Sequence, residues 1–292
     1  MAATSLSSTM KHLHWGIITD TADNTQAIFD ALTSYDSSDV LATTHYSEGQ
    51  PADIQPMLAA VNALYADTHD TWAMPLIVMA LKRGIPVVLK DPVDYAYHDF
   101  IRLLRICEQT GTDCYVDWSS IDLGLINMLL HTQLHHTLAN NGHSASLRLL
   151  CRYHATTSCW QHQALQQCFL LQALCGVIVD AVAIHAPHTQ RQAGILQFEN
   201  NMLCDALWMP CSTQHTPHTS LEAFTPDQHH TMCINNDGTT LINNQLHTTD
   251  SAAQHLPLLR QIVEALQGFN VCLSTVANAA SCAWVVDRLC RQ

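Results

Sequence analysis

The sequence predicts a two-domain protein: an α/β domain built on a parallel sheet, followed by an α+β domain with an open, mainly antiparallel sheet. Three observations support this prediction. Short apolar runs alternate with segments of helical spacing up to about residue 118, as in parallel sheets covered on both faces. Beyond residue 118, strand-like segments follow one another and the helical segments lengthen. A chain of 292 residues is also long for a single core.

The first domain is expected over residues 1–118. Apolar runs predict its strands, and apolar residues at helical spacing predict its helices. The expected strands are 14–19, 39–44, 63–66, 86–89 and 114–116. The expected helices are 25–35, 54–60, 72–83 and 96–110, with Gly84 and Gly111 ending the last two.

The second domain is expected over residues 119–292, with its last helix packing back on the first domain. Its expected helices are 121–139, 163–179, 256–266 and 274–290. Its expected strands are 146–154, 182–185, 194–198, 202–209, 231–234 and 240–242. The last two strands flank Asn-Asn-Asp-Gly, which is a strong hairpin signal. Residues 211–230 are interpreted as a polar loop.

The charge balance argues against two classes of partner. Lys and Arg total 12 against 25 Asp and Glu, which gives a formal net charge of −13. Binding to nucleic acid or to an anionic membrane needs a positive surface, and none is visible. No signal peptide and no run of about 18 apolar residues is found, so a cytoplasmic location without a membrane span is expected. The 12 cysteines are interpreted as reduced and mostly buried.

Four segments carry a resemblance to a known family. They read TWAMPLIVMALKRGIPVVLKDP, GILQFENNMLCDALW, TMCINNDGTTLIN and LPLLRQIVEALQGFNVCLSTVANAASCAWVVDRLC. In order and spacing the chain resembles the glucose–fructose oxidoreductase / inositol dehydrogenase (Gfo/Idh/MocA) family, and its length is similar to that of the biliverdin reductase branch. The resemblance implies a Rossmann-like nucleotide-binding domain, an oxidoreductase ancestry, and an oligomer formed through the open sheet of the second domain.

The cofactor loop departs from the family pattern. Aligned on Gly16, the glycine positions of the family's G-x-G-x-x-(G/A) turn fall on Thr19, Thr21 and Asn24. Side chains there would obstruct a close approach of backbone to pyrophosphate, and a carboxylate at Asp20 would repel it. An alternative role for Asp20 or Asp23 is to cap the first helix. The cofactor-binding positions that the resemblance implies are Gly16, Thr19, Asp20, Thr21, Thr68 and His69.

The expected catalytic turn departs as well. The family's Glu-Lys-Pro becomes Lys90-Asp91-Pro92, so the position of the lysine that positions the substrate holds Asp91. Lys90 lies one residue away and would face the other side of the strand unless a bulge shifted it. The catalytic candidates under the resemblance are nevertheless Lys90 and Asp91.

The family's acid–base histidine on the long helix of the second domain aligns with Val177, and its aspartate with Ala173. Asp180 is retained and is interpreted as a cap of the following strand, or as a distant catalytic candidate. Among the 19 histidines, four sequence pairs stand out: His12/His14, His135/His136, His215/His218 and His229/His230. Only His131 and His135 have the helical i, i+4 spacing of two metal ligands, and no metal site is predicted.

Two hypotheses follow. The first is a diverged, weakly catalytic or non-catalytic member that acts by binding a partner or an active paralogue, in a homo- or hetero-oligomer. The second is an NAD(P)-dependent reductase of a small or cyclic substrate with altered cofactor contacts, which rests on the fold alone. The sequence implies no cofactor under the first hypothesis, and NAD or NADP under the second.

Overall fold

The computed structural model describes residues 11–20, 25–45, 54–68, 73–92, 94–118, 145–154, 159–184, 191–211, 216–225, 228–235, 240–247, 258–269, 272 and 274–291. The chain divides into two compact units. Unit 1 comprises residues 1–119 with 258–277, and unit 2 comprises 120–257 with 278–292. None of the described helices is long and apolar enough to cross a membrane.

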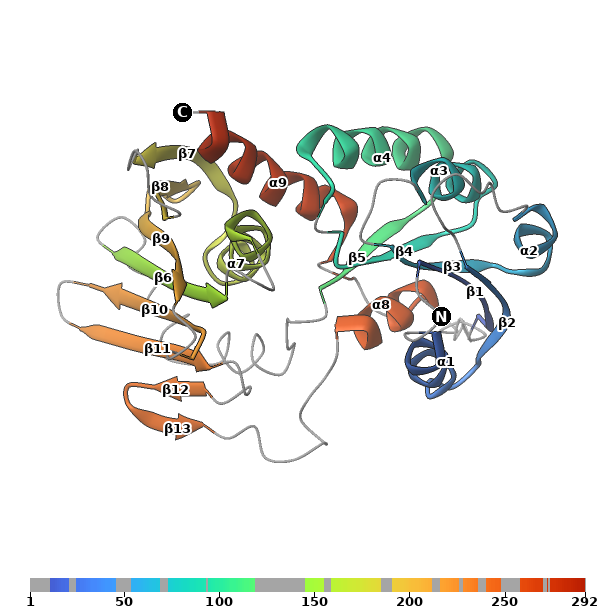
Figure 1. Ribbon diagram of the computed structural model, residues 1–292, viewed down its shortest axis with the longest axis horizontal. Coiled ribbons are helices and arrows are strands. Elements are labelled where there is room, and N and C mark those ends of the chain that lie inside the picture. Colours follow the sequence, from blue (N-terminus) through green and yellow to red (C-terminus); the bar gives the residue numbers. More distant parts are fainter. Residues whose placement is uncertain are drawn as a thin grey trace, which may run out of the picture. The chain divides into compact units, whose positions relative to one another are not determined.

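Unit 1 is built on a parallel five-stranded sheet (Figure 1). The order across the sheet is β2-β1-β3-β4-β5. The strands are β1 (Leu13–Thr19), β2 (Ser38–His45), β3 (Ala63–Asp67), β4 (Val87–Lys90) and β5 (Cys114–Asp117). The central strands are mostly apolar up to their last residue because helices cover both faces of the sheet, and β3 is buried at every residue.

The helices of unit 1 form two layers. They are α1 (Thr25–Thr33), α2 (Gln55–Ala60), α3 (Met74–Lys82), α4 (Tyr97–Thr110) and α8 (Leu258–Leu266). The helices α3 and α4 pack side by side on one face, and α1 and α8 lie on the other (Figure 1). Prolines in the first turn open α2 and α3. The Asp99 carboxylate accepts a 3.0 Å hydrogen bond from the Ala96 amide, which closes the first turn of α4.

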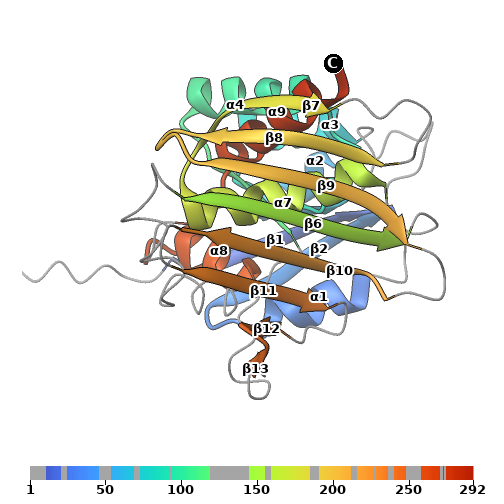
Figure 2. The same cartoon turned by 90° about the vertical axis from the view of Figure 1, so that its left-hand side faces the viewer.

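Unit 2 contains a mixed, mainly antiparallel sheet, with eight strands in the described part of the chain. Their order is β13-β12-β11-β10-β6-β9-β8-β7, and only β6 and β9 run parallel. The strands are β6 (Ser146–His154), β7 (Ile178–Ile184), β8 (Gln192–Phe198), β9 (Leu203–Cys211), β10 (His218–Phe224), β11 (His229–Asn235), β12 (Thr240–Ile242) and β13 (Gln245–His247). The helix α7 (Trp160–Cys175) packs on one face, behind the sheet in Figure 2.

The fold class expected from the sequence is confirmed: a Rossmann-like parallel sheet is followed by a mainly antiparallel one. All twelve cysteines are free thiols and seven of them are buried, in line with their expected packing role. The expected helix 121–139 and the pair His131/His135 lie outside the described residues.

Two expectations for unit 2 are wrong. Residues 218–224 form strand β10 instead of the expected loop, with Thr219, Leu221 and Ala223 pointing inward. Only the leucine of these three carries a strong apolar signal, so the strand pattern is weak in the sequence. The long helix ends at Cys175 instead of residue 179. Gly176 follows with a φ of 94°, a left-handed conformation that costs glycine little, and its amide closes the last turn by bonding the Gln172 carbonyl.

The chain returns to unit 1 through α8 and the segment after it. That the last helix packs back on the first domain stays a prediction. The Ser274 hydroxyl bonds the Val116 carbonyl, and the Gln267 side chain donates to the Asp36 carbonyl at 2.8 Å. Most of the last helix, α9 (Val276–Arg291), belongs to unit 2. It bonds α7 through Cys282, whose sulfur accepts from the Gln172 amide at 3.1 Å.

Candidate functional site

The carboxyl edge of the parallel sheet gathers several charged side chains of unit 1. The chain passes from β1 to β2 on one side and then places β3 on the other side of β1, so the direction of winding reverses between β1 and β3. In open α/β sheets ligands bind outside the carboxyl ends of the strands at such a reversal. The five strands end at this edge in Thr19, His45, Asp67, Lys90 and Asp117.

Strand register brings a lysine against a buried carboxylate. In the parallel ladders Thr19 lies opposite Asp67, and Lys90 lies opposite Asp117. The Lys90 ammonium reaches across to Asp67, with Nζ 3.2 Å from Oδ2. The side chain of Asp67 is 0% exposed and that of Lys90 is 23% exposed. The ion pair therefore lies at the border between the core and the edge of the sheet, with its carboxylate inside.

Asp117 forms the second buried polar contact of the edge. The Tyr65 hydroxyl donates a 2.7 Å hydrogen bond to Asp117 Oδ2. Burial raises the pKa of Asp117 to about 6, and the charges of Asp91 and Asp67 add to this rise. The bond from Tyr65 and the charge of Lys90 oppose it. Burial and the Asp117 charge also raise the pKa of Tyr65 well above its ordinary value, so the phenol is a hydrogen-bond donor at neutral pH.

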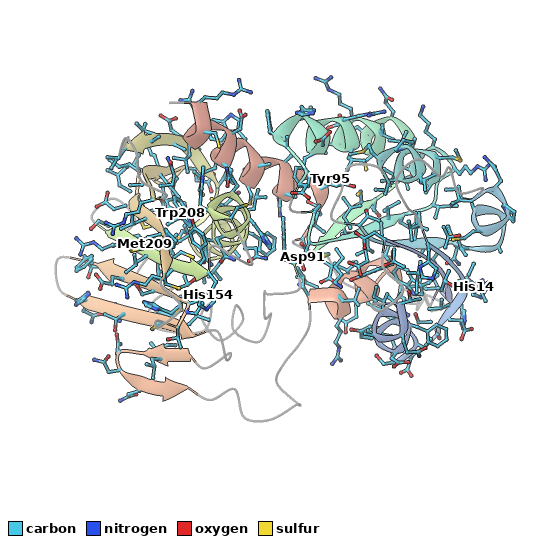
Figure 3. The ribbon with its side chains drawn as sticks, in the orientation of Figure 1. His14, Asp91, Tyr95, His154, Trp208 and Met209 are labelled. Carbon is cyan, nitrogen blue, oxygen red and sulfur yellow. The ribbon has the colours of Figure 1, made fainter. Side chains whose placement is uncertain are left out.

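Asp91 follows β4 in an unusual backbone conformation. Its φ is 39°, its side chain is buried, and its amide donates to the Asp117 carbonyl at 3.0 Å. Figure 3 labels it where β4 turns toward Tyr95. Positive φ values are uncommon for residues other than glycine and often mark functional turns. The ladder of β4 runs through Lys90 without a register shift, so the bulge considered from the sequence is not present.

Two polar atoms at the end of β3 lack partners among the described residues. They are Asp67 Oδ1 and Thr68 Oγ1, and both are buried. Burying a polar atom without a hydrogen bond costs about 1–3 kcal/mol, and such atoms in folded proteins call for an explanation. They lie beside the reversal between β1 and β3, where a bound ligand would satisfy them.

The other expected cofactor positions lie in different surroundings. Gly16 is buried in the middle of β1, where an added Cβ would come within 3.0 Å of the Met57 sulfur and 3.2 Å of Leu64. Its place is therefore explained by the close packing of α2. Thr19 is fully buried at the end of β1, and Asp20 is exposed just beyond it. Thr21 and His69 lie outside the described residues.

Unit 2 differs from the sequence interpretation at the expected acid–base positions. Val177 follows the end of α7, and Asp180 lies within β7, where it pairs with Arg288 at 3.1 Å instead of capping a strand. The polar pair one turn apart on α7 is His162 and Gln166, whose Nε2 atoms are 2.8 Å apart. An amide nitrogen only donates, so this contact places the lone pair of His162 on Nε2 and leaves its Nδ1 to carry the proton.

A pocket of about 560 Å³ opens between the end of α1 and α8. Its charged lining residues are Asp36, Arg260 and Glu264, and the last two pair at 3.0 Å along the helix. Burial raises the pKa of Tyr35 to about 12, with a contribution from the charge of Asp117. The lining thus holds a neutral phenol, a satisfied ion pair and one further carboxylate, which offers less chemistry than the carboxyl edge of the sheet.

Sequence reasoning missed Asp67, Asp117, Tyr65 and His162. The first two carried a usable signal, because each is a carboxylate at the end of a predicted buried strand, where parallel strands share an edge. Tyr65 carried none, since a tyrosine inside an apolar strand is typical of packing. His162 and Gln166 have the i, i+4 spacing of neighbours on one helix face.

Comparison with known proteins identifies relatives in structure. A comparison of the sequence with protein-family models found no match, and a comparison with curated protein sequences found none either. The WlbA dehydrogenase from Bordetella pertussis, solved with NADH and UDP-GlcNAcA, is similar with a TM-score of 0.70 at 12% identity, covering 96% of each chain. UDP-N-acetylglucosamine 3-dehydrogenase GnnA from Acidithiobacillus ferrooxidans has a TM-score of 0.68 at 12% identity, covering 96% of this chain and 97% of that one.

Biliverdin reductase from Synechocystis, solved with biliverdin and NADP+, has a TM-score of 0.64 at 14% identity, covering 96% of this chain and 98% of that one. These neighbours are Gfo/Idh/MocA-type NAD(P)-dependent oxidoreductases, and the resemblance expected from the sequence is confirmed at the level of the fold. The chain has the fold of the Gfo/Idh/MocA NAD(P)-dependent oxidoreductases along nearly its whole length.

Proposed function

We propose that this protein is an NAD(P)-dependent oxidoreductase of a small or cyclic substrate, with cofactor contacts that differ from a glycine-rich loop. The observation that carries the proposal is the pair of buried atoms Asp67 Oδ1 and Thr68 Oγ1, which have no partner among the described residues. They lie where the winding of the sheet reverses, which is the usual ligand position of this architecture. Structural neighbours that carry NADH or NADP+ support the same cofactor class.

The donors and acceptors at this edge fit the uncharged part of a dinucleotide. The Asp67 carboxylate accepts from a hydroxyl or an amide N–H, and the Thr68 hydroxyl both donates and accepts. The carboxylates of Asp67, Asp91 and Asp117 disfavour a phosphate beside them, so a ribose or carboxamide suits this edge better. A bound nicotinamide would supply hydride transfer. Lys90, held by Asp67, would donate a hydrogen bond from Nζ to a substrate oxygen.

Cofactor binding is the first test. NADH and NADPH are titrated into the protein by calorimetry, and into the variants Thr68→Val and Thr112→Val. Thr112 is also buried but precedes β5, at the opposite edge of the sheet, so it serves as the matched control. Loss of one buried hydrogen bond is worth about 1–1.5 kcal/mol, or roughly a tenfold weaker affinity. We expect that loss in Thr68→Val and parent-like affinity in Thr112→Val.

The same titration separates this proposal from a non-catalytic role. If neither cofactor releases heat or stabilises the protein at millimolar concentration, the oxidoreductase proposal fails. The hypothesis of a role through a partner or an active paralogue would then be preferred. Binding that is unaffected by Thr68→Val would place the cofactor elsewhere.

A homo-oligomer through the open sheet of unit 2 is the second part of the proposal. Val182 and Ile184 on β7 and Leu203 on β9 are 45%, 49% and 47% exposed. Ladder register places Val182 opposite Ile195 on the sheet face away from α7, which is the face nearest the viewer in Figure 2. Apolar side chains grouped on one face favour association over a solvated surface.

Val182→Lys and Ile184→Lys are expected to lower the molar mass measured by light scattering after gel filtration. Leu41→Lys is the matched control, because Leu41 is a strand residue of unit 1 with 51% exposure. A parent protein that is monomeric at micromolar concentration would refute this part. A mass lowered equally by Leu41→Lys would refute it too.

A further inference from the structure

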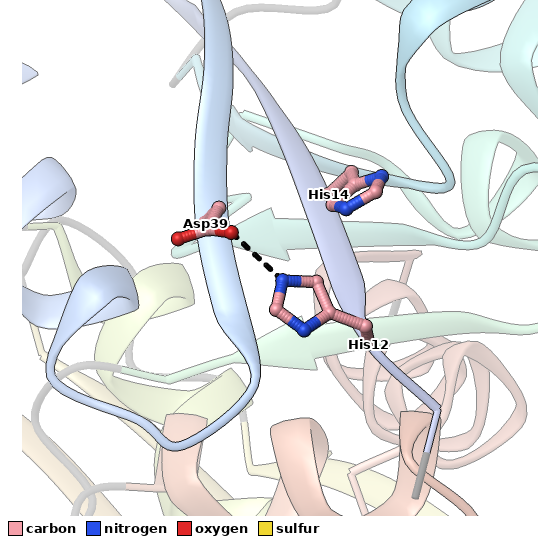
Figure 4. A group of neighbouring side chains, drawn as sticks. All are labelled: His12, His14 and Asp39. Carbon is pink, nitrogen blue, oxygen red and sulfur yellow. Dashed lines mark hydrogen bonds and ion pairs between the residues drawn. The ribbon is translucent and has the colours of Figure 1, made fainter.

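Three side chains at the amino edge of the parallel sheet converge in a way that the proposed function does not use. His12 precedes β1, His14 is its second residue, and Asp39 is the second residue of β2. Residues two apart on an extended chain point to the same face, and the register of β1 with β2 places His14 directly opposite Asp39. Figure 4 shows the three side chains as neighbours, with His12 bonded to Asp39.

We propose that His12, His14 and Asp39 form a binding site for a zinc-class divalent metal ion. One ligand atom from each residue lies within 4.8 Å of the others. His12 Nε2 is 2.8 Å from Asp39 Oδ2, and the two imidazole centroids are 4.9 Å apart. Donor atoms around a tetrahedral zinc with bonds near 2.1 Å lie about 3.4 Å apart. The ligand atoms lie between 2.8 Å and at most 4.8 Å apart, a range that includes this value, so side-chain rotation could bring all three atoms onto one ion.

The backbone of this site is fixed by a fourth residue. Asn62, just before β3, accepts a 2.8 Å hydrogen bond from the His14 amide and donates a 2.9 Å bond to the His12 carbonyl. One amide side chain therefore holds both histidine positions relative to the sheet. Such support holds the backbone positions of both histidines before metal arrives, so that only their side chains need to adjust.

The donor set indicates the class of ion. Two imidazole nitrogens and one carboxylate oxygen suit Zn²⁺ and its neighbours in the transition series, whereas Mg²⁺ prefers oxygen ligands and water. Three protein ligands leave a coordination position for water. The side chains of His12 and Asp39 are 47% and 62% exposed, so an ion can reach them from solvent.

The site is independent of the carboxyl edge. His14 and Thr19 are five residues apart on β1, which corresponds to about 16 Å at 3.3 Å per residue. A metal here would tie the start of β1 to β2 and stabilise unit 1 through its preference for the folded chain.

Calorimetric titration of the untagged full-length protein with ZnCl₂ tests the proposal. Parent protein is compared with His12→Gln, His14→Gln, Asp39→Asn and the control His98→Gln. His98 on α4 also lies near a carboxylate, 3.4 Å from Asp99, and its side chain is 82% exposed. Among the described residues it belongs to no group of three metal-ligating side chains, so it serves as the matched control. MgCl₂ serves as the oxygen-preferring control ion.

We expect one Zn²⁺ bound per chain, at least about tenfold weaker binding in each of the three ligand variants, and parent-like binding in His98→Gln. MgCl₂ should give no comparable heat. Circular dichroism without metal verifies that each variant is folded. If His14→Gln does not fold, His12→Gln still tests the site, because His12 is its more exposed histidine. Equal affinity in parent and ligand variants, or equal loss in His98→Gln, would show adventitious binding by surface histidines and overturn the proposal.

Discussion

Removing Lys90 should lower the free energy of unfolding, because its ammonium is the counter-charge of the buried Asp67 carboxylate. In the variant Lys90→Met, Asp67 keeps its place at 0% exposure but loses the ammonium 3.2 Å away. At an effective dielectric constant of about 20, two unit charges at that distance attract by about 5 kcal/mol. Lys90 is 23% exposed and loses part of its hydration in the pair, which reduces the net value. We expect a loss of about 3 kcal/mol in the free energy of unfolding at pH 7.

A double-mutant cycle separates the charge pair from the loss of packing. Asp67→Asn removes the buried charge, so Lys90→Met in that background should cost at least about 2 kcal/mol less than it does alone. Lys82→Met is the matched control, since Lys82 is an exposed lysine at the end of α3. Urea unfolding followed by circular dichroism gives the four values. A cost below about 1 kcal/mol for Lys90→Met, or an equal cost in both backgrounds, would refute the reasoning.

Two further perturbations test buried groups of each unit. The pKa of Asp117, near 6 in the folded chain against about 4 unfolded, means that the folded state binds more protons between these values. The contribution of Asp117 to the free energy of unfolding therefore falls as pH rises through about 6. Asp117→Asn should raise the free energy of unfolding by up to about 3 kcal/mol at pH 7 but little at pH 4. Urea unfolding at both pH values measures this difference. Gly176→Ala should lower the melting temperature more than Gly84→Ala, because both have positive φ but only at Gly176 would a Cβ meet the Glu199 carboxylate, at 2.8 Å.

The sequence by itself determined which segments form the buried sheet of unit 1. Strands such as β3 and β4 are continuous apolar runs between helical segments, and this pattern is local, so it can be read without the fold. Strand β10 was missed because its inward residues include a threonine and an alanine, whose apolar signal is weak. The end of α7 was misplaced because Gly176 stops it in the middle of an apolar run.

Only the tertiary structure decided which polar side chains meet. Lys90 and Asp67 are 23 residues apart, and Tyr65 and Asp117 are 52 apart, so no sequence spacing brings either pair together. His14 and Asp39 meet for the same reason, through the register of β1 with β2. Parallel pairing is set by burial along whole strands, and the residues at strand ends become neighbours as its consequence. The fold could therefore be predicted from local pattern. Which charged side chains become neighbours at the two edges of the sheet depends on the long-range register of the strands.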